Sequence, residues 1–359
     1  MEGQAYLLVL IGFVALAGGG ELLVRGSARL ALGLRIPPLV VGLTVVAYGT
    51  SAPEAAVTVA AAREGSGAVG LGNVVGSGIF NVLVVLGLSA VAAPLVVTRQ
   101  LIRTEVPIMI GTSALLWLLC LEGTLDRADG LLLVALMLAY TVYTVRNGRR
   151  NHDAGAGIEE DVPRGRRDFA RCIALVVAGL VLLVLGAGWL LDGVVEAARR
   201  LGVSELIIGL TLVAAGTSLP EVATSVVASL RGQREIAIGN VVGSNIFNVL
   251  FAVGAAASVA PEPLAVPPSM LAFDLPLLVA VQVACLPIFF RNLRIERWEG
   301  GLFLAGYGAY LTYLVLDATG HDALEGFSWL MVTFVLPFLV ATLVALGADG
   351  IRLDRKRRR

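Results

Sequence analysis

The sequence contains few charged residues, few histidines and few cysteines. Charged residues make up 15% of the 359 residues, whereas hydrophobic residues make up 57%, and the mean hydropathy is +0.85. A soluble domain is nearer one quarter charged. Apolar runs of about 20 residues, the length that crosses a bilayer, recur from end to end. The sequence therefore predicts an all-α polytopic membrane protein.

The scarce residue types exclude several kinds of site. The only histidines, His152 and His321, lie in polar connections, so no imidazole inside the membrane is available for proton relay or zinc binding. Cys120, Cys172 and Cys285 are far apart, with neither metal-ligand spacing nor the pattern of a disulfide framework. We interpret them as small buried hydrophobic residues.

Charged, glycine-rich and proline-rich connections divide the chain into eleven candidate spans. We expect them at residues 5–24, 38–62, 69–93, 105–121, 129–145, 170–191, 205–229, 236–258, 270–290, 300–316 and 328–347. The first run follows "MEGQA", without a basic region or a clear cleavage site. It is therefore predicted to be a retained span and not a signal peptide.

Arginines are concentrated in every second connection. The connections after spans 1, 3, 5, 7 and 9 and the tail "RLDRKRRR" are basic, whereas the other connections carry only Arg63, Arg127, Arg199 and Arg200. The positive-inside rule then predicts an external N-terminus and a cytoplasmic C-terminus in a cell (inner) membrane. The polar segment 146–169 becomes a cytoplasmic linker, although its acidic residues leave ligand binding there open.

A shift of 167 residues superimposes two parts of the chain. Residues 42–83 match residues 209–250 at 25 of 42 positions, with "GTSAPE" facing "GTSLPE" and "GNVVGSGIFNVL" facing "GNVVGSNIFNVL". Five spans separate the copies, so the second copy runs through the membrane in the opposite direction. Inverted repeats with a site near the membrane midplane are typical of secondary transporters.

The repeat divides the chain into two transmembrane halves of five spans each. The predicted organisation is a first half at 1–145, the linker at 146–169, a second half at 170–316, and an extra helix with a basic tail at 317–359. We have no functional interpretation of the eleventh span.

Each copy places a proline and a glutamate inside an apolar run. Pro53 and Pro220 have no N–H to donate to the carbonyl four residues earlier, so backbone oxygens are freed within the membrane. A plain proline kink is the alternative interpretation. Glu54 and Glu221 favour a functional site over a plain kink. A charge at the bilayer centre costs about 2.5–3.5 kcal/mol, and neither span contains a lysine or arginine to pair with it. A cation is the expected partner.

Further polar residues accompany the carboxylates: a threonine and a serine lie four and three residues before each glutamate on the same helix face, and a serine and an asparagine at i, i+4 share one face of the following span. They are Thr50, Ser51, Ser77 and Asn81 in the first copy, and Thr217, Ser218, Ser244 and Asn248 in the second. Four glycines, Gly72, Gly76, Gly239 and Gly243, are predicted to let the helices approach closely. The combined set offers only oxygen ligands, which suit hard cations, with calcium taking about 6–8 of them. Sodium could occupy the same oxygens.

Three other acidic residues have a simpler interpretation. Glu105 and Asp274 each begin a predicted span two residues before a proline, so we expect an interfacial role at a helix start. Glu21 lies near Arg25 and is predicted to form an interfacial ion pair.

At the paired motifs the sequence resembles the sodium/calcium exchanger family, of prokaryotic type, within the calcium/cation antiporter superfamily. The resemblance implies ten core helices in two inverted halves, with spans 2, 3, 7 and 8 at the centre and spans 1 and 6 as gating helices. It also implies calcium ligands from Glu54, Glu221 and the backbone carbonyls of Thr50 and Thr217. Sodium sites are implied at positions matching Ser51, Ser77, Ser218 and Ser244. Gly78 departs from its counterpart Asn245, and both Asn81 and Asn248 are neutral.

These observations predict an antiporter, and not an enzyme, that exchanges Na⁺ for Ca²⁺ by alternating access. Its partners are the two ions and the lipid bilayer, with no resident cofactor and no nucleic acid. Proton/calcium exchange on the same fold stays open, because buried carboxylates can carry protons. A passive channel is disfavoured by the inverted repeat, and a serine hydrolase by the absence of a nearby base.

Overall fold

The computed structural model describes residues 2–150, 165–203, 205–208, 211–212, 214–290, 293–336, 340 and 344. Within this part of the chain, eight helices are long and apolar enough to cross a membrane, and a ninth span is a helix pair bent by 47°. The prediction of an all-helical polytopic protein is confirmed. The number of eleven spans is not tested, because spans 205–229 and 328–347, like most of the linker and the basic tail, lie partly or wholly outside the described residues.

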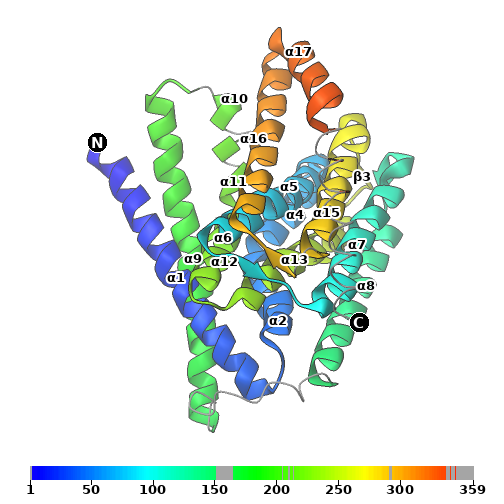
Figure 1. Cartoon of the computed structure of the whole chain (residues 1–359). Coiled ribbons are helices and arrows are strands. Elements are labelled where there is room, and N and C mark those ends of the chain that lie inside the picture. The colour runs from blue at the N-terminus through cyan, green and yellow to red at the C-terminus, as the bar shows by residue number, and fades with distance from the viewer. Residues whose placement is uncertain are drawn as a thin grey trace.

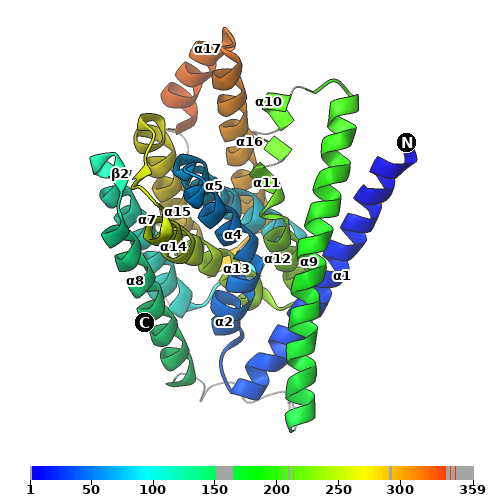
Figure 2. The ribbon, with the colours of Figure 1, turned by 180° about the vertical axis from the view of Figure 1, so that it is seen from behind.

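The elements follow the same order in the two halves (Figures 1 and 2). The first half consists of α1 (Glu2–Leu34), α2 (Pro38–Val41), η1 (Gly42–Val46), α3 (Ala47–Thr50), α4 (Ala52–Arg63), α5 (Gly67–Phe80), η2 (Asn81–Leu86), α6 (Gly87–Ala92), β1 (Leu95–Val96), η3 (Leu101–Glu105), α7 (Val106–Leu119), η4 (Cys120–Glu122), β2 (Thr124–Leu125) and α8 (Arg127–Arg150). The second consists of α9 (Arg166–Arg200), α10 (Glu205–Ile208), α11 (Ala214–Gly216), α12 (Leu219–Leu230), α13 (Arg234–Phe247), η8 (Asn248–Val253), α14 (Gly254–Val259), β3 (Leu264–Ala265), η9 (Met270–Asp274), α15 (Leu275–Phe290), β4 (Arg294–Ile295) and α16 (Arg297–Thr319). The helix α17 (Ala323–Leu330) and the π-helical segment η10 (Met331–Val335) follow.

Two short strand pairs join the halves. β1 pairs antiparallel with β4, and β2 pairs antiparallel with β3. Since β1 corresponds to β3 in the element order, and β2 to β4, exchanging the halves converts one pair into the other. The two halves therefore contact each other through two equivalent strand pairs.

The long helices α1 and α9 run antiparallel along one flank of the molecule (Figure 1). Glycines at seven-residue spacing bring their backbones together: a Cβ at Gly12 would lie 2.8 Å from Gly186 O, and one at Gly19 would lie 2.9 Å from Gly179 O. Both helices are longer than the predicted spans 5–24 and 170–191. Small residues permit this close approach where lipid offers no hydrophobic driving force.

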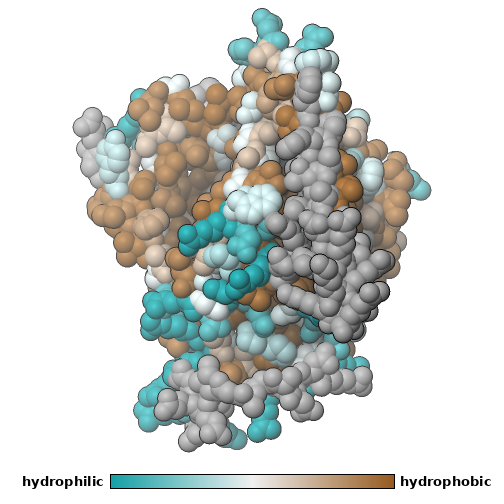
Figure 3. Space-filling view, viewed as in Figure 1, coloured by the Kyte–Doolittle hydropathy of each residue, from teal (hydrophilic) through white to brown (hydrophobic). Residues whose placement is uncertain are grey.

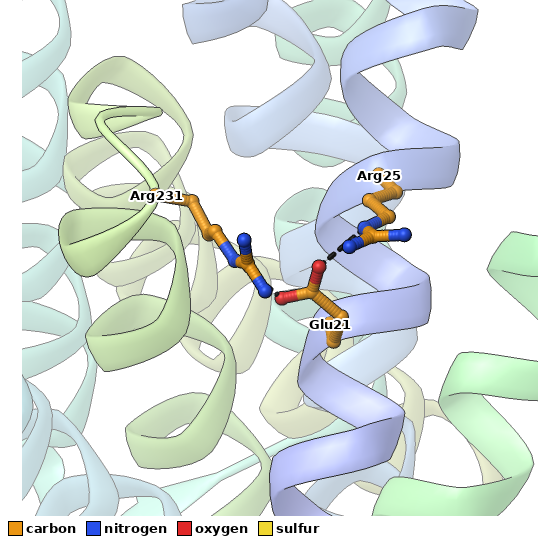
Figure 4. A network of polar contacts seen from close by, with 3 residues as sticks. All are labelled: Glu21, Arg25 and Arg231. Carbon is orange, nitrogen blue, oxygen red and sulfur yellow. Dashed lines mark hydrogen bonds and ion pairs between the residues drawn. The ribbon is translucent and has the colours of Figure 1, made fainter.

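Glu21 connects α1 to the end of α12. It contacts Arg25 on its own helix, as predicted, and also accepts a hydrogen bond from Arg231 Nε at 2.7 Å (Figure 4). Arg231 follows the last residue of α12 directly. An exposed ion pair of this kind is worth about 0–1 kcal/mol, so it orients the two elements more than it stabilises them.

The outer surface of the helix bundle is largely apolar along its sides. Hydrophobic residues cover the upper flank formed by α1 and α9, whereas hydrophilic residues gather towards the lower end and at the tip of α16 and α17 (Figure 3). Large apolar side chains such as Tyr6, Phe13 and Val177 are more than half exposed. Exposed apolar surface of this extent is suited to lipid contact. The centre is occupied by α4, α5, α12 and α13, of which α13 is buried almost along its whole length.

Candidate functional site

The two "GTSxPE" motifs break their helices as the prolines predict. Ser51, with φ −86° and ψ 4°, separates α3 from α4, and Ser218, with φ −91° and ψ 7°, occupies the matching place before α12. Each proline lies in the first turn of the new helix, where its missing N–H costs nothing. Glu54 therefore enters the first turn of α4, where the helix dipole favours a negative charge.

Glu221 enters the first turn of α12 in the same way, and the two glutamates meet through crossed hydrogen bonds. Ser51 Oγ donates to Glu221 Oε1 at 2.9 Å, and Ser218 Oγ donates to Glu54 Oε1 at 3.1 Å. All four side chains are fully buried. Each carboxylate is thus bonded by the serine of the other repeat, which places both carboxylates in one site between the halves.

Ser77 extends this site into α5, where its hydroxyl lies 3.2 Å from Ser218 Oγ. Several other predicted site residues present buried polar atoms that have no hydrogen-bond partner within the described part of the chain. These are Oε2 of Glu54 and of Glu221, both amide atoms of Asn81 and of Asn248, and the hydroxyl oxygens of Ser244 and Thr217. A buried polar atom without a partner costs about 1–3 kcal/mol, so these clustered atoms are chemically suited to bind a ligand.

The charges at the site suit a cation. In the described residues no ion pair reaches Glu54 or Glu221. Nor does any third acidic, histidine or cysteine residue join them in a group that could hold a metal, within the same residues. Two carboxylates and an otherwise neutral set of oxygens can balance at most two positive charges.

The side chain of Thr50 connects the site to α13. Its hydroxyl donates to Asn240 Oδ1 at 3.0 Å and lies 3.3 Å from Ala47 O. Its backbone carbonyl, which the family resemblance implies as a ligand, is not part of these contacts. Asn240 in turn donates to Ser225 Oγ at 2.9 Å.

Asn240 and its counterpart Asn73 were not among the predicted site residues. Asn73 Nδ2 lies 3.2 Å from Thr58 Oγ1 and 3.4 Å from Glu54 O. The signal for both residues was present in the sequence, since the asparagine stands in both copies of "GNVVGS".

Two expectations from the sequence are wrong in detail. Glu105 does not lie exposed at a helix start: it is the last residue of the π-helical segment η3, is fully buried and accepts a hydrogen bond from Tyr140 at 3.0 Å. The glycines also differ between the repeats. A Cβ at Gly243 would lie 2.6 Å from Leu43 O, whereas none of the described residues lies within 4 Å of one at Gly76.

The missing amide at Gly78 has a steric reason. A Cβ at this position would lie 3.1 Å from Asn245 Oδ1 and 2.7 Å from Leu278 Cδ1. Asn245 Oδ1 also accepts a hydrogen bond from Gln282 at 3.2 Å. The two repeats meet here, so one large side chain fits where two would collide.

Comparison with known proteins agrees with this geometry. The family model described as sodium/calcium exchanger protein matches residues 4–146 and 172–316. The inner membrane protein YrbG of Escherichia coli (strain K12) is 32% identical over 317 residues, which cover 86% of this chain and 96% of that protein. The sodium/calcium exchanger MaX1 of Methanosarcina acetivorans is 30% identical over 344 residues, covering 86% and 98%. The solved structure of the sodium/calcium exchanger from Methanococcus jannaschii superimposes with a TM-score of 0.75 at 29% identity, covering 87% of this chain and 99% of that one.

Proposed function

Because the chain belongs to the sodium/calcium exchanger family, we propose that it exchanges Na⁺ for Ca²⁺ at the site between Glu54 and Glu221. The site is alternately open to the two sides of a cell (inner) membrane. Family membership establishes an exchanger of calcium and another cation; the coupling ion and the ligands belong to the proposal.

The crossed serine–glutamate pair is the observation that carries the proposal. Each serine occupies only Oε1 of the opposite carboxylate, and both Oε2 atoms remain buried without a partner among the described residues. Calcium binds about 6–8 oxygens in flexible geometry, and two carboxylates balance its charge. Magnesium keeps several waters and suits a fully buried site less well.

The remaining ligands are assigned by their positions around the carboxylates. Glu54 and Glu221 hold calcium together with the backbone carbonyls of Thr50 and Thr217. The sodium or shared cation positions use the hydroxyls and amides on the adjoining helices, namely Ser51, Ser77, Asn81, Ser218, Ser244 and Asn248. This ring of hydroxyls and amides favours sodium over protons as the coupling ion, because protons need no such coordination shell.

Coupling follows from the cost of an empty site. Two buried carboxylates without a cation are unfavourable at the centre of a bilayer, so the unloaded carrier resists the change of access. Calcium bound in one direction of transport, and sodium bound in the other, neutralise the carboxylates and so lower the cost of changing access. Exchange of ions is thereby faster than the net leak of either ion.

The proposal is tested with purified protein in proteoliposomes. We expect calcium uptake when vesicles loaded with sodium are diluted into choline buffer, and loss of uptake in Glu54→Gln and Glu221→Gln. Glu64→Gln is the matched control, because Glu64 is an exposed carboxylate that follows the last residue of the same helix as Glu54. It should transport like the parent.

A second set of vesicles, with an acid interior and no sodium, separates the coupling ions. Uptake driven only by the proton gradient would replace sodium by protons and keep the glutamates. Full uptake in either glutamine variant would overturn the site assignment.

A further inference from the structure

Asn73 and Asn240 occupy the same place in the two repeats and make one contact in common. Asn73 Nδ2 lies 3.2 Å from Thr58 Oγ1, and Asn240 Nδ2 donates to Ser225 Oγ, the counterpart of Thr58, at 2.9 Å. Each amide is therefore fixed through its nitrogen to the helix that carries a site glutamate. Its oxygen remains available to a second partner.

That second partner is present in only one repeat. Asn240 Oδ1 accepts a hydrogen bond from Thr50 Oγ1 at 3.0 Å, which ties the broken end of α3 to α13. Thr217 is the counterpart of Thr50. Its hydroxyl oxygen is buried and has no partner among the described residues, and Asn73 is only partly buried. One of two equivalent hydrogen bonds is therefore made and the other is not.

The helix packing around the two amides shows the same difference. Cβ atoms at Gly239 and Gly243 would lie 2.8 Å from Leu39 O and 2.6 Å from Leu43 O, so this face of α13 is closed by backbone. On α5 the described residues leave the matching face open. A Cβ at Gly72 would meet only Met270 Cε at 3.6 Å.

Gly76, the next glycine on that face of α5, has no described residue within 4 Å of its Cβ position. Side chains beside the two faces follow the same pattern, since Val69 is 65% exposed and its counterpart Ile236 is fully buried. The residue types are nearly the same at these places, so composition does not explain why one face is closed and the other open. The glycines of α5 preserve room for a close approach that this conformation does not use.

We propose that Asn73 and Asn240 are positioning residues, each of which accepts a hydrogen bond from the threonine of the other repeat in only one of two conformations. In a second conformation Thr217 donates to Asn73 Oδ1, and α11 closes on the Gly72 and Gly76 face of α5, which it already contacts. Thr50 then leaves Asn240. The inference rests on the proposed alternating access and assigns it a specific pair of hydrogen bonds.

The exchange of one bond for its counterpart explains how the two conformations stay close in free energy. Each conformation satisfies one threonine hydroxyl and leaves the other without a partner, so the hydrogen-bond terms nearly cancel. The bound ions can then decide which conformation is populated, since a ligand shifts an equilibrium only by its difference in affinity for the two states.

The test measures exposure of the α5 face directly. In a background without Cys120, Cys172 and Cys285, Val69→Cys is labelled with a membrane-impermeant maleimide. The calcium concentration is the one at which the parent reacts at half its maximal rate. One hydrogen bond shifts the equilibrium between the two conformations roughly two- to tenfold. We therefore expect Thr50→Val to lower the labelling rate by up to about fivefold and Thr217→Val to raise it towards its maximum, by at most about twofold.

Conservative and blocking variants complete the test. Thr50→Ser and Thr217→Ser keep the hydroxyl and should return the rate to that of the parent. Gly76→Leu fits the open face but blocks its closure, so labelling should stay maximal at every calcium concentration. Shifts of both valine variants in the same direction, or parent labelling that does not depend on ions, would overturn the inference. Calcium uptake by the parent is measured separately, so a failure of the exchange function is distinguished from a failure of the hydrogen-bond pair.

Discussion

At the scale of single residues, the site is built from pairs whose members belong to different repeats. Ser51 bonds Glu221, and Ser218 bonds Glu54, so neither half contains a complete site. Asn81 and Asn248 stand one turn beyond Ser77 and Ser244, at the start of the π-helical segments η2 and η8. A π-helical turn redirects the side chains that follow it, and such turns are frequent at functional sites.

Replacing Asn81 should weaken cation binding less than replacing a glutamate. Asn81 is fully buried and its amide has no partner among the described residues, so Asn81→Ala removes a neutral ligand and leaves both charges in place. We expect calcium affinity to fall about 5- to 10-fold, the worth of one polar contact of about 1–1.5 kcal/mol. Equilibrium binding of radioactive calcium to detergent-purified protein measures this. A loss as large as that of Glu54→Gln would mean that the amide does more than supply one ligand.

At the scale of elements, glycine spacing determines how α1 and α9 pack. Gly12 and Gly19 on α1 and Gly179 and Gly186 on α9 are related by the same shift of 167 residues as the two motifs. Each glycine faces backbone of the other helix. The repeat therefore includes a packing surface as well as the site, and this surface pairs with its own copy.

A side chain at Gly12 should destabilise the protein, whereas one at Gly18 should not. The Cβ of Gly12→Ala would lie 2.5 Å from Leu190 N, whereas no atom in the described part of the chain lies within 4 Å of a Cβ at Gly18. Overpacking of this kind costs about 1–3 kcal/mol. Alanine also restricts the unfolded chain, so Gly18→Ala should be neutral or slightly stabilising. Thermal unfolding in detergent compares the two variants, and equal unfolding temperatures would contradict the close packing of α1 and α9.

At the scale of the whole molecule, the halves are held together by the strand pairs, by helix contacts and by the shared site. Two further glycine pairs show this, because Gly87 faces Gly300 and Gly130 faces Gly254. Because these contacts join the halves directly, we expect the covalent linker to contribute little to the stability of the folded protein.

Calcium should therefore stabilise the complete fold through the shared site. A cation that binds only the folded protein contributes about 2.7 kcal/mol at one hundred times its dissociation constant. We expect the unfolding temperature to rise with calcium concentration in the parent and to stay constant in Glu221→Gln. A rise of equal size in both proteins would place the stabilising calcium elsewhere.

Because direct contacts join the two halves, removing part of the linker should have little effect on exchange. Residues 151–162 lie outside the described residues, and their polar sequence predicts a solvated connection. We expect a deletion of these residues to leave basal calcium exchange in proteoliposomes within about twofold of the parent, the scatter that context gives to a change away from the site. Loss of exchange in folded protein would show that the segment has a functional role.

Much of this protein follows from the sequence alone. The membrane helices, the breaks at Pro53 and Pro220 and the central place of Glu54 and Glu221 are local consequences of hydrophobicity, of a missing N–H and of a charge that needs a partner. The shift of 167 residues also related the two halves, because identical polar residues at fixed offsets cannot arise from shared composition.

Only the tertiary structure decided which residues face each other across the repeats. It directed Ser51 to Glu221 and not to Glu54 on its own helix, buried Glu105 against Tyr140, and closed the glycine face of α13 while leaving that of α5 open. The sequence of one repeat is nearly the sequence of the other, so it cannot state how they differ in one conformation. That difference arises from packing between the halves, where each contact depends on where the opposite half lies.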